Sequence, residues 1–390
     1  MSRPILSDFS FSAFSAGFVA VLIGFSSSVA IVFQAAQAAG ATQSMTVSWI
    51  IALGIGMGVT CLGYSWYYKQ PVITAWSTPG AALLAVSLTG VPIEQAIGAF
   101  LFAGLLTTLL GLSGMFDRIM ARLPLPIASA MLAGILFKFG LDVFLSVKTN
   151  PWLVGIMLIS YLLGKRWLPR YSVLLVLATG ILVAFVIQHQ PLESVELQFS
   201  MPVWVTPAFD WQVLLGIGLP LFIVTMTSQN VPGVATLRAS GYRHLPISPV
   251  ITGTGLATLL LAPFGGFAFN LAAITAAICT NPESHPDPDK RYIAGLSAGL
   301  FYILAGVGGA TVVAIFTAFP VELVAALAGI ALFGTIAASL ASATAQPEYR
   351  EAAVITLLVT ASGIELFGIA SPFWGLIAGV IAHLFICQKH

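Results

Sequence analysis

The chain has 390 residues, of which 58% are hydrophobic and 7% are charged, and its formal net charge is +1. Soluble proteins carry about 25% charged residues, so this composition excludes a soluble domain, and the near-neutral charge gives no reason to expect nucleic-acid binding. The apolar runs are continuous over about 20 residues, which predicts membrane-spanning helices rather than a barrel. The 3 cysteines lie far apart, so neither a disulfide framework nor a zinc site is expected.

We predict an all-α polytopic membrane protein with fourteen spans and both termini in the cytoplasm. Thirteen of the 15 basic residues then lie in cytoplasmic segments, while Lys148 lies outside and Lys138 lies within a span. The predicted spans are centred near residues 26, 56, 80, 104, 134, 157, 179, 222, 255, 272, 303, 330, 359 and 378.

The third predicted span contains TAWSTPGAALL (74–84), which is an unusual sequence for the middle of a membrane helix. Pro79 has no backbone N–H and disfavours helix at Thr78, but Pro is favoured at the first position of a helix that Ser or Thr caps. We therefore predict that Thr78 is the N-cap, that Pro79 is the first helical residue and that 74–77 are extended. A half-helix would then begin in the middle of the membrane and run outward.

The tenth predicted span, APFGGFAFNLAAITAAICTN (262–281), is interrupted in a similar way. Gly265 and Gly266 loosen the backbone, and Asn270 is the predicted N-cap of a second half-helix, 271–280, that runs inward. Two helix N-termini, each with about half a positive charge, would then face one another and form a seat for a small anion. The alternative is a pair of packing kinks, because Gly and Pro are common in membrane helices.

Polar side chains also mark the first and eighth spans. The sequence GFSSSVAIVFQAAQ (24–37) carries three serines and two glutamines, and VTMTSQNVPGV (224–234) ends in a Pro-Gly pair that predicts a distortion. Such groups hold helices together or line a site, and we favour a site in the eighth span. The amides of Gln229 and Asn230 can donate hydrogen bonds to a carboxylate, while Trp76, Phe267 and Phe269 can pack on an aromatic ring.

Ionisable residues inside spans are candidates for proton transfer. Lys138 and Glu365 are the proton-coupling candidates, although Lys138 can instead pair with Asp142, and Glu322 is expected at the outer interface. The substrate itself could also carry the proton. The loop ESHPDPDK (283–290) has alternating metal-ligand types, but we favour a helix start there and expect no metal.

The two halves of the chain contain local matches at an offset of about 195 residues. LLGLSG (109–114) matches LAGVGG (304–309), and LAGI recurs at 132–135 and 327–330. Seven spans per half is an odd number, so the halves (1–190 and 206–390) form a 7+7 inverted repeat with broken third and tenth spans. Many secondary transporters have this architecture.

The motifs AWSTPGAALL, VTMTSQNVPG, AAITAAICTNPESHPDPDKR and TASG…SPFWGLIAG resemble benzoate/H⁺ symporters of the BenE type over nearly the whole chain. The resemblance implies the fold of UraA-like nucleobase and SulP-type anion transporters. It also implies core spans at about 12–116 and 209–316 and gate spans at about 123–188 and 319–388, with a possible homodimer through the gate. The substrate-binding residues that we expect are Ser27, Trp76, Ser77, Thr78, Gly80, Thr227, Ser228, Gln229, Asn230, Gly266, Phe267, Phe269 and Asn270.

One departure from the relatives bears on the substrate. Nucleobase transporters of this fold use acidic residues on the eighth and tenth spans, where this chain has Gln229 and Asn270. The absence of an acid suits an anion. We therefore expect proton-coupled uptake of benzoate or a related aromatic carboxylate across a bacterial inner membrane, and the alternative is an anion channel or exchanger of the same fold. No cofactor is expected, and without a catalytic or nucleotide-binding motif the chain is not expected to be an enzyme.

Overall fold

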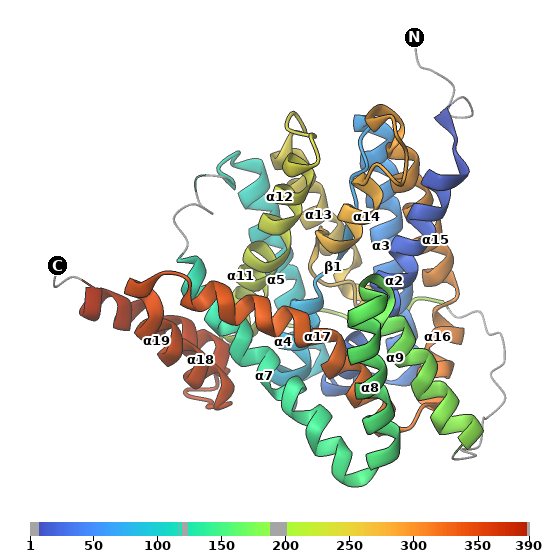
Figure 1. Cartoon of the computed structure of the whole chain (residues 1–390). Helices are drawn as coiled ribbons and strands as arrows, with labels where there is room; N and C mark the ends of the chain where they lie inside the picture. Colours follow the sequence, from blue (N-terminus) through green and yellow to red (C-terminus); the bar gives the residue numbers. More distant parts are fainter. Residues whose placement is uncertain (1–7, 117, 119–123, 188–200, 388–390) are drawn as a thin grey trace.

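The computed structural model describes residues 8–116, 118, 124–187 and 201–387, without the side chains of residues 26, 27, 170 and 387 (Figure 1). These residues form helices, several with π or 3₁₀ turns, and two short strands. In chain order the main elements are α2 (Phe11–Ala38), α3 (Gln43–Tyr68), β1 (Thr74–Trp76), α4 (Thr78–Ser87), α5 (Ile93–Leu112), α7 (Leu125–Thr149), α8 (Pro151–Trp167), the 3₁₀ turn η1 (Pro169–Tyr171), α9 (Ser172–Ile181) with the π turn η2 (Leu182–Ile187), α10 (Trp211–Val213), the π turn η3 (Leu214–Gly218), α11 (Leu219–Thr225), the π turn η4 (Met226–Asn230), α12 (Val231–Ala239), α13 (Ile247–Leu261), β2 (Phe269–Leu271), α14 (Ile274–Thr280), α15 (Tyr292–Val307), α16 (Gly309–Ala318), α17 (Val321–Thr344), α18 (Arg350–Ala361) and α19 (Ser371–Cys387).

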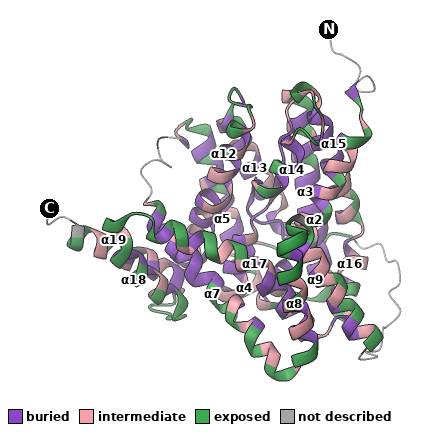
Figure 2. Ribbon diagram, viewed as in Figure 1, coloured by how far each residue is buried: buried purple, intermediate pink, exposed green. Residues whose placement is uncertain are grey.

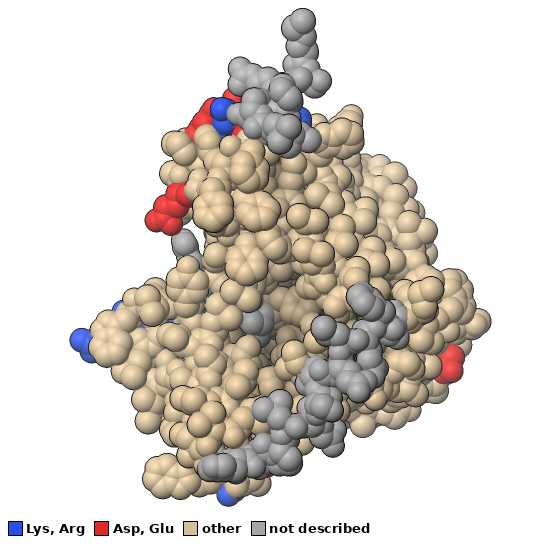
Figure 3. Space-filling model, turned by 90° about the vertical axis from the view of Figure 1, so that its right-hand side faces the viewer, with Lys and Arg blue, Asp and Glu red and all other residues tan. Residues whose placement is uncertain are grey.

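The helices have the lengths and surfaces of a membrane protein. Within the described ranges six helices are long and apolar enough to cross a bilayer, or eight if each of two bent helix pairs is one span. Thirteen of the fourteen predicted span centres fall inside helices, and residue 272 falls between β2 and α14. On the face shown in Figure 3, charged residues appear only at the margins of a broad uncharged surface. Such a surface matches lipid rather than water.

Two antiparallel strands cross the middle of the molecule, and only the first, β1, lies where the sequence predicted extended chain (74–77). The β1–β2 pair aligns Thr74 with Leu271, Ala75 with Asn270 and Trp76 with Phe269. Two further backbone bonds, from Ala272 N to Ile73 O and from Ser77 N to Ala268 O, extend the pairing on either side. Each strand leads directly toward a short helix, α4 or α14, so the pair brings two helix N-termini from distant parts of the chain together (Figure 1).

The backbone groups on the other edge of β1 bond to sulfur atoms of α3. The N–H of Thr74 donates to Cys61 Sγ at 3.2 Å, and the N–H of Trp76 donates to Met57 Sδ at 3.2 Å. A buried strand must satisfy its backbone donors, and β1 does so with side chains because no third strand lies beside it in the two-stranded sheet. The two strands are therefore held on both sides within the helical core.

Helix packing divides the molecule into two groups. In the first, α3 packs on α15 and α5 on α13; in the second, α7 packs on α17, α8 on α9 and α18 on α19. The approach of α3 to α15 is very close, because a Cβ on Gly54 would lie 2.4 Å from Gly306 Cα. Buried residues are concentrated around α3, α5 and α14, whereas α8, α18 and α19 have broad exposed faces (Figure 2). The first group is the better-buried body, and the crossing strands lie within it.

Candidate substrate site

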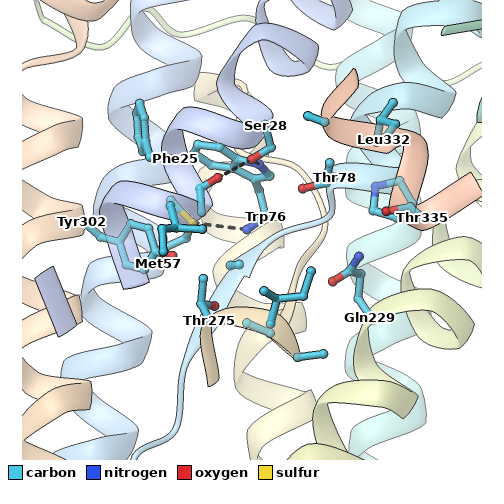
Figure 4. Close-up of a pocket in the computed structure, with 18 residues that line it drawn as sticks. Phe25, Ser28, Met57, Trp76, Thr78, Gln229, Thr275, Tyr302, Leu332 and Thr335 are labelled. Atoms are coloured by element: carbon cyan, nitrogen blue, oxygen red, sulfur yellow. Dashed lines mark hydrogen bonds between the residues drawn. The ribbon is translucent and has the colours of Figure 1, made fainter. Parts of the chain in front are cut away.

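A cavity of about 130 Å³ lies at the ends of the crossing strands. Seven parts of the chain line it: α2, α3, β1 with the start of α4, η4, the start of α14, α15 and α17 (Figure 4). Its side chains form two sets, the larger apolar groups Phe25, Met57, Trp76, Tyr302 and Leu332, and the polar groups Ser28, Thr78, Gln229, Thr275 and Thr335. An engineered apolar cavity of roughly 150 Å³ is known to hold benzene, so a single aromatic ring fits this space.

Trp76 forms part of the apolar wall in a fixed orientation. Its indole N–H donates to Ser28 Oγ at 3.0 Å, and Ser28 in turn donates to Gly24 O at 2.7 Å. The edge of the Phe25 ring packs against the indole with the ring centres 5.1 Å apart. Since the indole is 3% exposed and its one donor is satisfied, it presents a rigid aromatic surface to the cavity. The prediction that Trp76 lies beside the break is confirmed.

The α4 helix begins one residue earlier than the sequence predicted. Ser77, not Thr78, is the N-cap, and its hydroxyl accepts a hydrogen bond from Gly80 N at 3.0 Å. Pro79 therefore occupies the second helical position. A Cβ on Gly80 would lie 2.8 Å from that hydroxyl, so Gly80 maintains the cap and does not line the cavity. With Pro79 lacking a donor and Gly80 bonded to Ser77, Thr78 is the residue of this turn that offers its N–H and hydroxyl to the cavity.

The α14 helix differs from the prediction more strongly. It starts at Ile274, its N-cap is Ala273, and no side chain caps it. Asn270, the predicted cap, lies in β2 with its Nδ2 donating to Ala268 O at 2.9 Å, so that assignment was wrong. Thr275, in the first turn, lines the cavity and is 6% exposed. Its hydroxyl lies near the Tyr302 hydroxyl but makes no hydrogen bond of good geometry.

The polar run of the eighth predicted span forms a π turn, so the distortion predicted there is confirmed. Gln229 extends from this turn into the cavity beside α14 (Figure 4). Thr227 instead donates to Ile223 O at 2.8 Å, and Asn230 Oδ1 accepts from Leu271 N at 2.9 Å. Because π turns widen a helix locally, this one sends Gln229 to the cavity while Asn230 clamps β2. Ser228 faces a neighbouring cavity.

Three more predicted residues lie in the core beneath the strands rather than in the cavity wall. The Phe267 ring packs between Trp49 and Phe100, with ring centres 5.9 and 5.7 Å away. Phe269 fills the space over Gly56, where a Cβ would collide with its ring, and Gly266 N donates to Leu261 O. Phe267 and Phe269 were expected to pack on a substrate ring. Besides Trp76, however, the aromatic side chains that line the cavity are Phe25 of α2 and Tyr302 of α15. The side chain of Ser27 lies outside the described residues.

A second cavity of about 590 Å³ adjoins the first, and we name it the vestibule. It shares Ile23, Gln229, Ala273, Ile274, Ala331 and Thr335 with the inner cavity. Its remaining wall comes from α8, η1, α9, η4, α12, α17 and the far end of α14. Gln229 and Thr335 therefore stand at the junction between the two spaces.

Comparisons with known proteins identify the family of the chain. Residues 7–385 match the family described as BenE, benzoate membrane transport protein. The chain belongs to this family. It is 47% identical to inner membrane protein YdcO of Escherichia coli (strain K12) over 371 residues, covering 95% of this chain and 94% of that protein. It is 42% identical to a benzoate membrane transport protein of Acinetobacter baylyi over 386 residues, covering 99% and 98%.

Solved structures show the same fold at low sequence identity. The transmembrane domain of the cyanobacterium bicarbonate transporter BicA matches with a TM-score of 0.62 and 16% identity, over 97% of this chain and 98% of that one. SLC26A9 matches with a TM-score of 0.64 and 14% identity, over 98% and 66%. The chain is thus a multi-pass membrane transport protein by its family, with a largely helical fold that resembles those of BicA and SLC26A9. Membership of a transport family also confirms that it is not an enzyme.

The proton-coupling candidates of this BenE-family chain lie away from the cavity. Lys138 is exposed on α7, and among the described residues it forms no ion pair with Asp142. Glu365 was predicted inside a span, but α18 ends at Ala361 and Glu365 is exposed in the connection to α19. Glu322 lies in the first turn of α17. Among the described residues that line the inner cavity, none is Asp, Glu, His, Lys or Arg.

Proposed function

We propose that this BenE-family transporter carries benzoate or a related aromatic carboxylate into the cell across the bacterial inner membrane, together with a proton. The observation that carries the proposal is the inner cavity, which has an aromatic wall at one side and two helix N-termini at the other. A flat ring bearing one carboxylate has the matching division into an apolar part and an anionic end. The name of the Acinetobacter relative supports the same substrate.

The carboxylate would bind at the polar side of the cavity. The first-turn N–H groups of a helix have no partners within the helix and carry positive partial charge. Here α14 presents such a turn with the buried Thr275 hydroxyl, α4 adds Thr78, and the Gln229 amide comes from a third direction (Figure 4). The ring would then lie against Trp76 and Phe25. No buried acid of the lining residues would repel the anion.

We further propose that the fold is the fourteen-span, 7+7 inverted repeat. The packing pairs support this, because exchanging the two halves converts one pair into another. The exchange turns α3 on α15 into α13 on α5, and α8 on α9 into α18 on α19, and it maps α7 on α17 onto itself. It also pairs the β1–α4 break with the β2–α14 break. With cytoplasmic termini, thirteen of the 15 basic residues face the cytoplasm, as expected for an inner-membrane protein.

Alternating access would then move the core elements, α2–α5 and α10–α16, against the gate elements, α7–α9 and α17–α19. The inner cavity lies between them, since most of its wall belongs to the core while Ala331, Leu332 and Thr335 come from α17 of the gate. A shift of the core relative to α17 would therefore change which side of the membrane reaches the substrate.

The proton, we propose, crosses on the substrate carboxylate. Since Ser77 and Pro79 leave α4 with few free donors, the two helix ends compensate less than the full charge of a carboxylate. Moving the remaining charge into a space of low polarity raises the pKa of the acid and favours its neutral form. This mechanism needs no ionisable side chain, which fits the cavity wall, and it makes transport electroneutral.

Uptake of labelled benzoate into proteoliposomes tests the proposal. An inward proton gradient should accelerate saturable uptake several-fold, while an imposed voltage at constant pH should change it little. Protein-free liposomes are the essential control, because benzoic acid crosses lipid unaided. Saturable benzoate flux that follows voltage and ignores the pH gradient would instead identify the anion channel or exchanger of the same fold.

A further inference from the structure

Among the described side chains on the wall of the vestibule, one carries a formal charge, and that charge is positive. Among the described residues that line the inner cavity or the vestibule, Lys165 of α8 is the one Asp, Glu, His, Lys or Arg. Along the described part of the wall, an anion that passes between the inner cavity and the far end of the vestibule therefore meets one cation and no acid; the side chain of Arg170, next to the lining residue Pro169, lies outside the described residues. Glu283, the acidic residue nearest to the lining residue Asn281 along the chain, is exposed and does not belong to the wall.

The surroundings of Lys165 combine a charge with an aromatic face. Its Nζ lies 5.7 Å from the centre of the Tyr161 ring, one helical turn earlier on α8. Tyr161 also lines the vestibule, and its ring is held edge-on against Phe333 with the centres 5.7 Å apart. On the opposite wall, Asn281 Oδ1 accepts the N–H of Glu283 at 2.9 Å, which leaves the Asn281 amide N–H₂ as a donor. Like the inner cavity, the vestibule therefore combines an aromatic side chain with groups that can donate hydrogen bonds to a carboxylate, but it is more open.

We propose that Lys165, with Tyr161 beside it, forms a staging site that binds the substrate carboxylate at the mouth of the vestibule before and after it occupies the inner cavity. The inference rests on the proposed function, because it assumes an aromatic carboxylate as substrate. Lys165 lies in the last turn of α8 and is exposed, so its ammonium is hydrated and attracts an anion without trapping it. A single cation in an otherwise neutral passage raises the local concentration of anions and hence their rate of association.

The test compares Lys165→Gln with Arg166→Gln. Arg166 is the adjacent basic residue of the same helical turn, but it does not line the vestibule. Stopped-flow fluorescence of the purified full-length protein would give association and dissociation rates for benzoate, and for neutral benzamide, at low and high salt. We expect Lys165→Gln to slow benzoate association roughly three- to tenfold at low salt and to abolish its salt dependence. Dissociation of benzoate and association of benzamide should stay unchanged, and Lys165→Arg should restore the wild-type rates.

Three outcomes would contradict the staging site. Equal benzoate kinetics in Lys165→Gln and wild type would remove the role of Lys165, and equal slowing in Arg166→Gln would reduce it to a general surface-charge effect. Faster benzoate dissociation with unchanged association would make Lys165 part of the final binding site instead. Failure of wild-type protein to bind any aromatic acid would refute the proposed function itself, whereas normal wild-type binding with an unaffected Lys165→Gln variant would refute only the staging site.

Discussion

The two half-helices that border the inner cavity differ in how their N-termini are used. The α4 helix has 10 residues, a side-chain cap from Ser77, a proline in its first turn and a mostly buried surface. The α14 helix has 7 residues and no side-chain cap, and Ile274 at its start is 74% exposed. In α4, therefore, a side chain of the protein accepts a first-turn N–H, whereas the first-turn N–H groups of α14 stay available to a ligand. We infer that α14 is the main seat of the carboxylate and that α4 mainly anchors the strand pair.

The opposite end of α14 is held by a buried arginine. Arg291 is 6% exposed, and it donates to Thr280 O at 2.9 Å, to His285 O at 2.7 Å and to Pro286 O at 3.4 Å. A cation at the C-terminus of a helix compensates the negative end of its dipole. Arg291 thus fixes the short helix at its C-terminal end, whereas α4 relies on its own N-cap.

The largest effect should come from Arg291→Gln. The substitution removes the charge and takes the donor from three carbonyls, of which that of Thr280 is buried, which should cost about 2–4 kcal/mol of stability. Thermal unfolding in detergent should show a fall of several degrees, together with weaker benzoate binding. Arg243→Gln, at an exposed position of the same face, is the control. Equal thermal stability of the two variants would show that α14 does not depend on Arg291.

Gln229→Glu should have the next largest effect. The new carboxylate would lie beside the α14 N-terminus and repel, or displace, the substrate carboxylate, so benzoate affinity should fall at least about tenfold. Gln229→Met removes the amide without adding charge and should cost less. Binding is measured by ligand-induced thermal stabilisation, with benzamide as the neutral ligand. If both variants weaken benzoate and benzamide alike, the carboxylate does not bind near Gln229.

Thr275→Val tests the free end of α14 directly. Loss of one hydroxyl donor to a charged ligand should reduce benzoate affinity roughly fivefold, an effect of about 1 kcal/mol. Stability should stay the same or rise, because the hydroxyl is buried without a hydrogen bond of good geometry. Thr335→Val, across the cavity on α17, serves as the comparison. A larger loss in Thr335→Val than in Thr275→Val would move the carboxylate seat to the gate side.

Ser77→Ala should give the opposite pattern and the smallest effect on binding. Removal of an N-cap side chain costs about 1 kcal/mol of stability. Benzoate affinity should change less than roughly twofold, because Ser77 bonds to Gly80 and does not line the cavity. Unfolding and ligand titration on the same preparation measure both quantities. A strong loss of benzoate affinity without loss of stability would overturn the contrast between α4 and α14.

The sequence was informative where local chemistry decides the structure. Pro79 disfavours helix in the residues before it and the Gly265–Gly266 pair loosens the backbone, so both interruptions could be predicted. The cap of α4 was misplaced by one residue because Ser77 and Thr78 can both cap and Pro fits the second helical position as well as the first. Asn270 was misread because its role depends on pairing with β1, a contact between distant residues.

The remaining errors have the same origin. Phe25, Met57 and Tyr302 carry no local mark, since the chain has 26 Phe, 9 Met and 9 Tyr, and only the packing of α2, α3 and α15 brings these three to the cavity. Thr275 would have been noticed had the start of the second half-helix been placed at Ile274. Glu365 was predicted in a span because hydropathy alone does not show at which residue α18 ends.

The ladder between β1 and β2 determines how the substrate can travel. Two strands joined by backbone hydrogen bonds cannot slide past one another without breaking several of them at once, in a place where no water replaces what is lost. In the proposed mechanism, the core elements of the two halves would therefore move together as one rigid unit, with the bound acid fixed to them. Spin labels on the two short helices, α4 and α14, should keep a constant separation through the transport cycle. The distance from either label to a label on α17 should change.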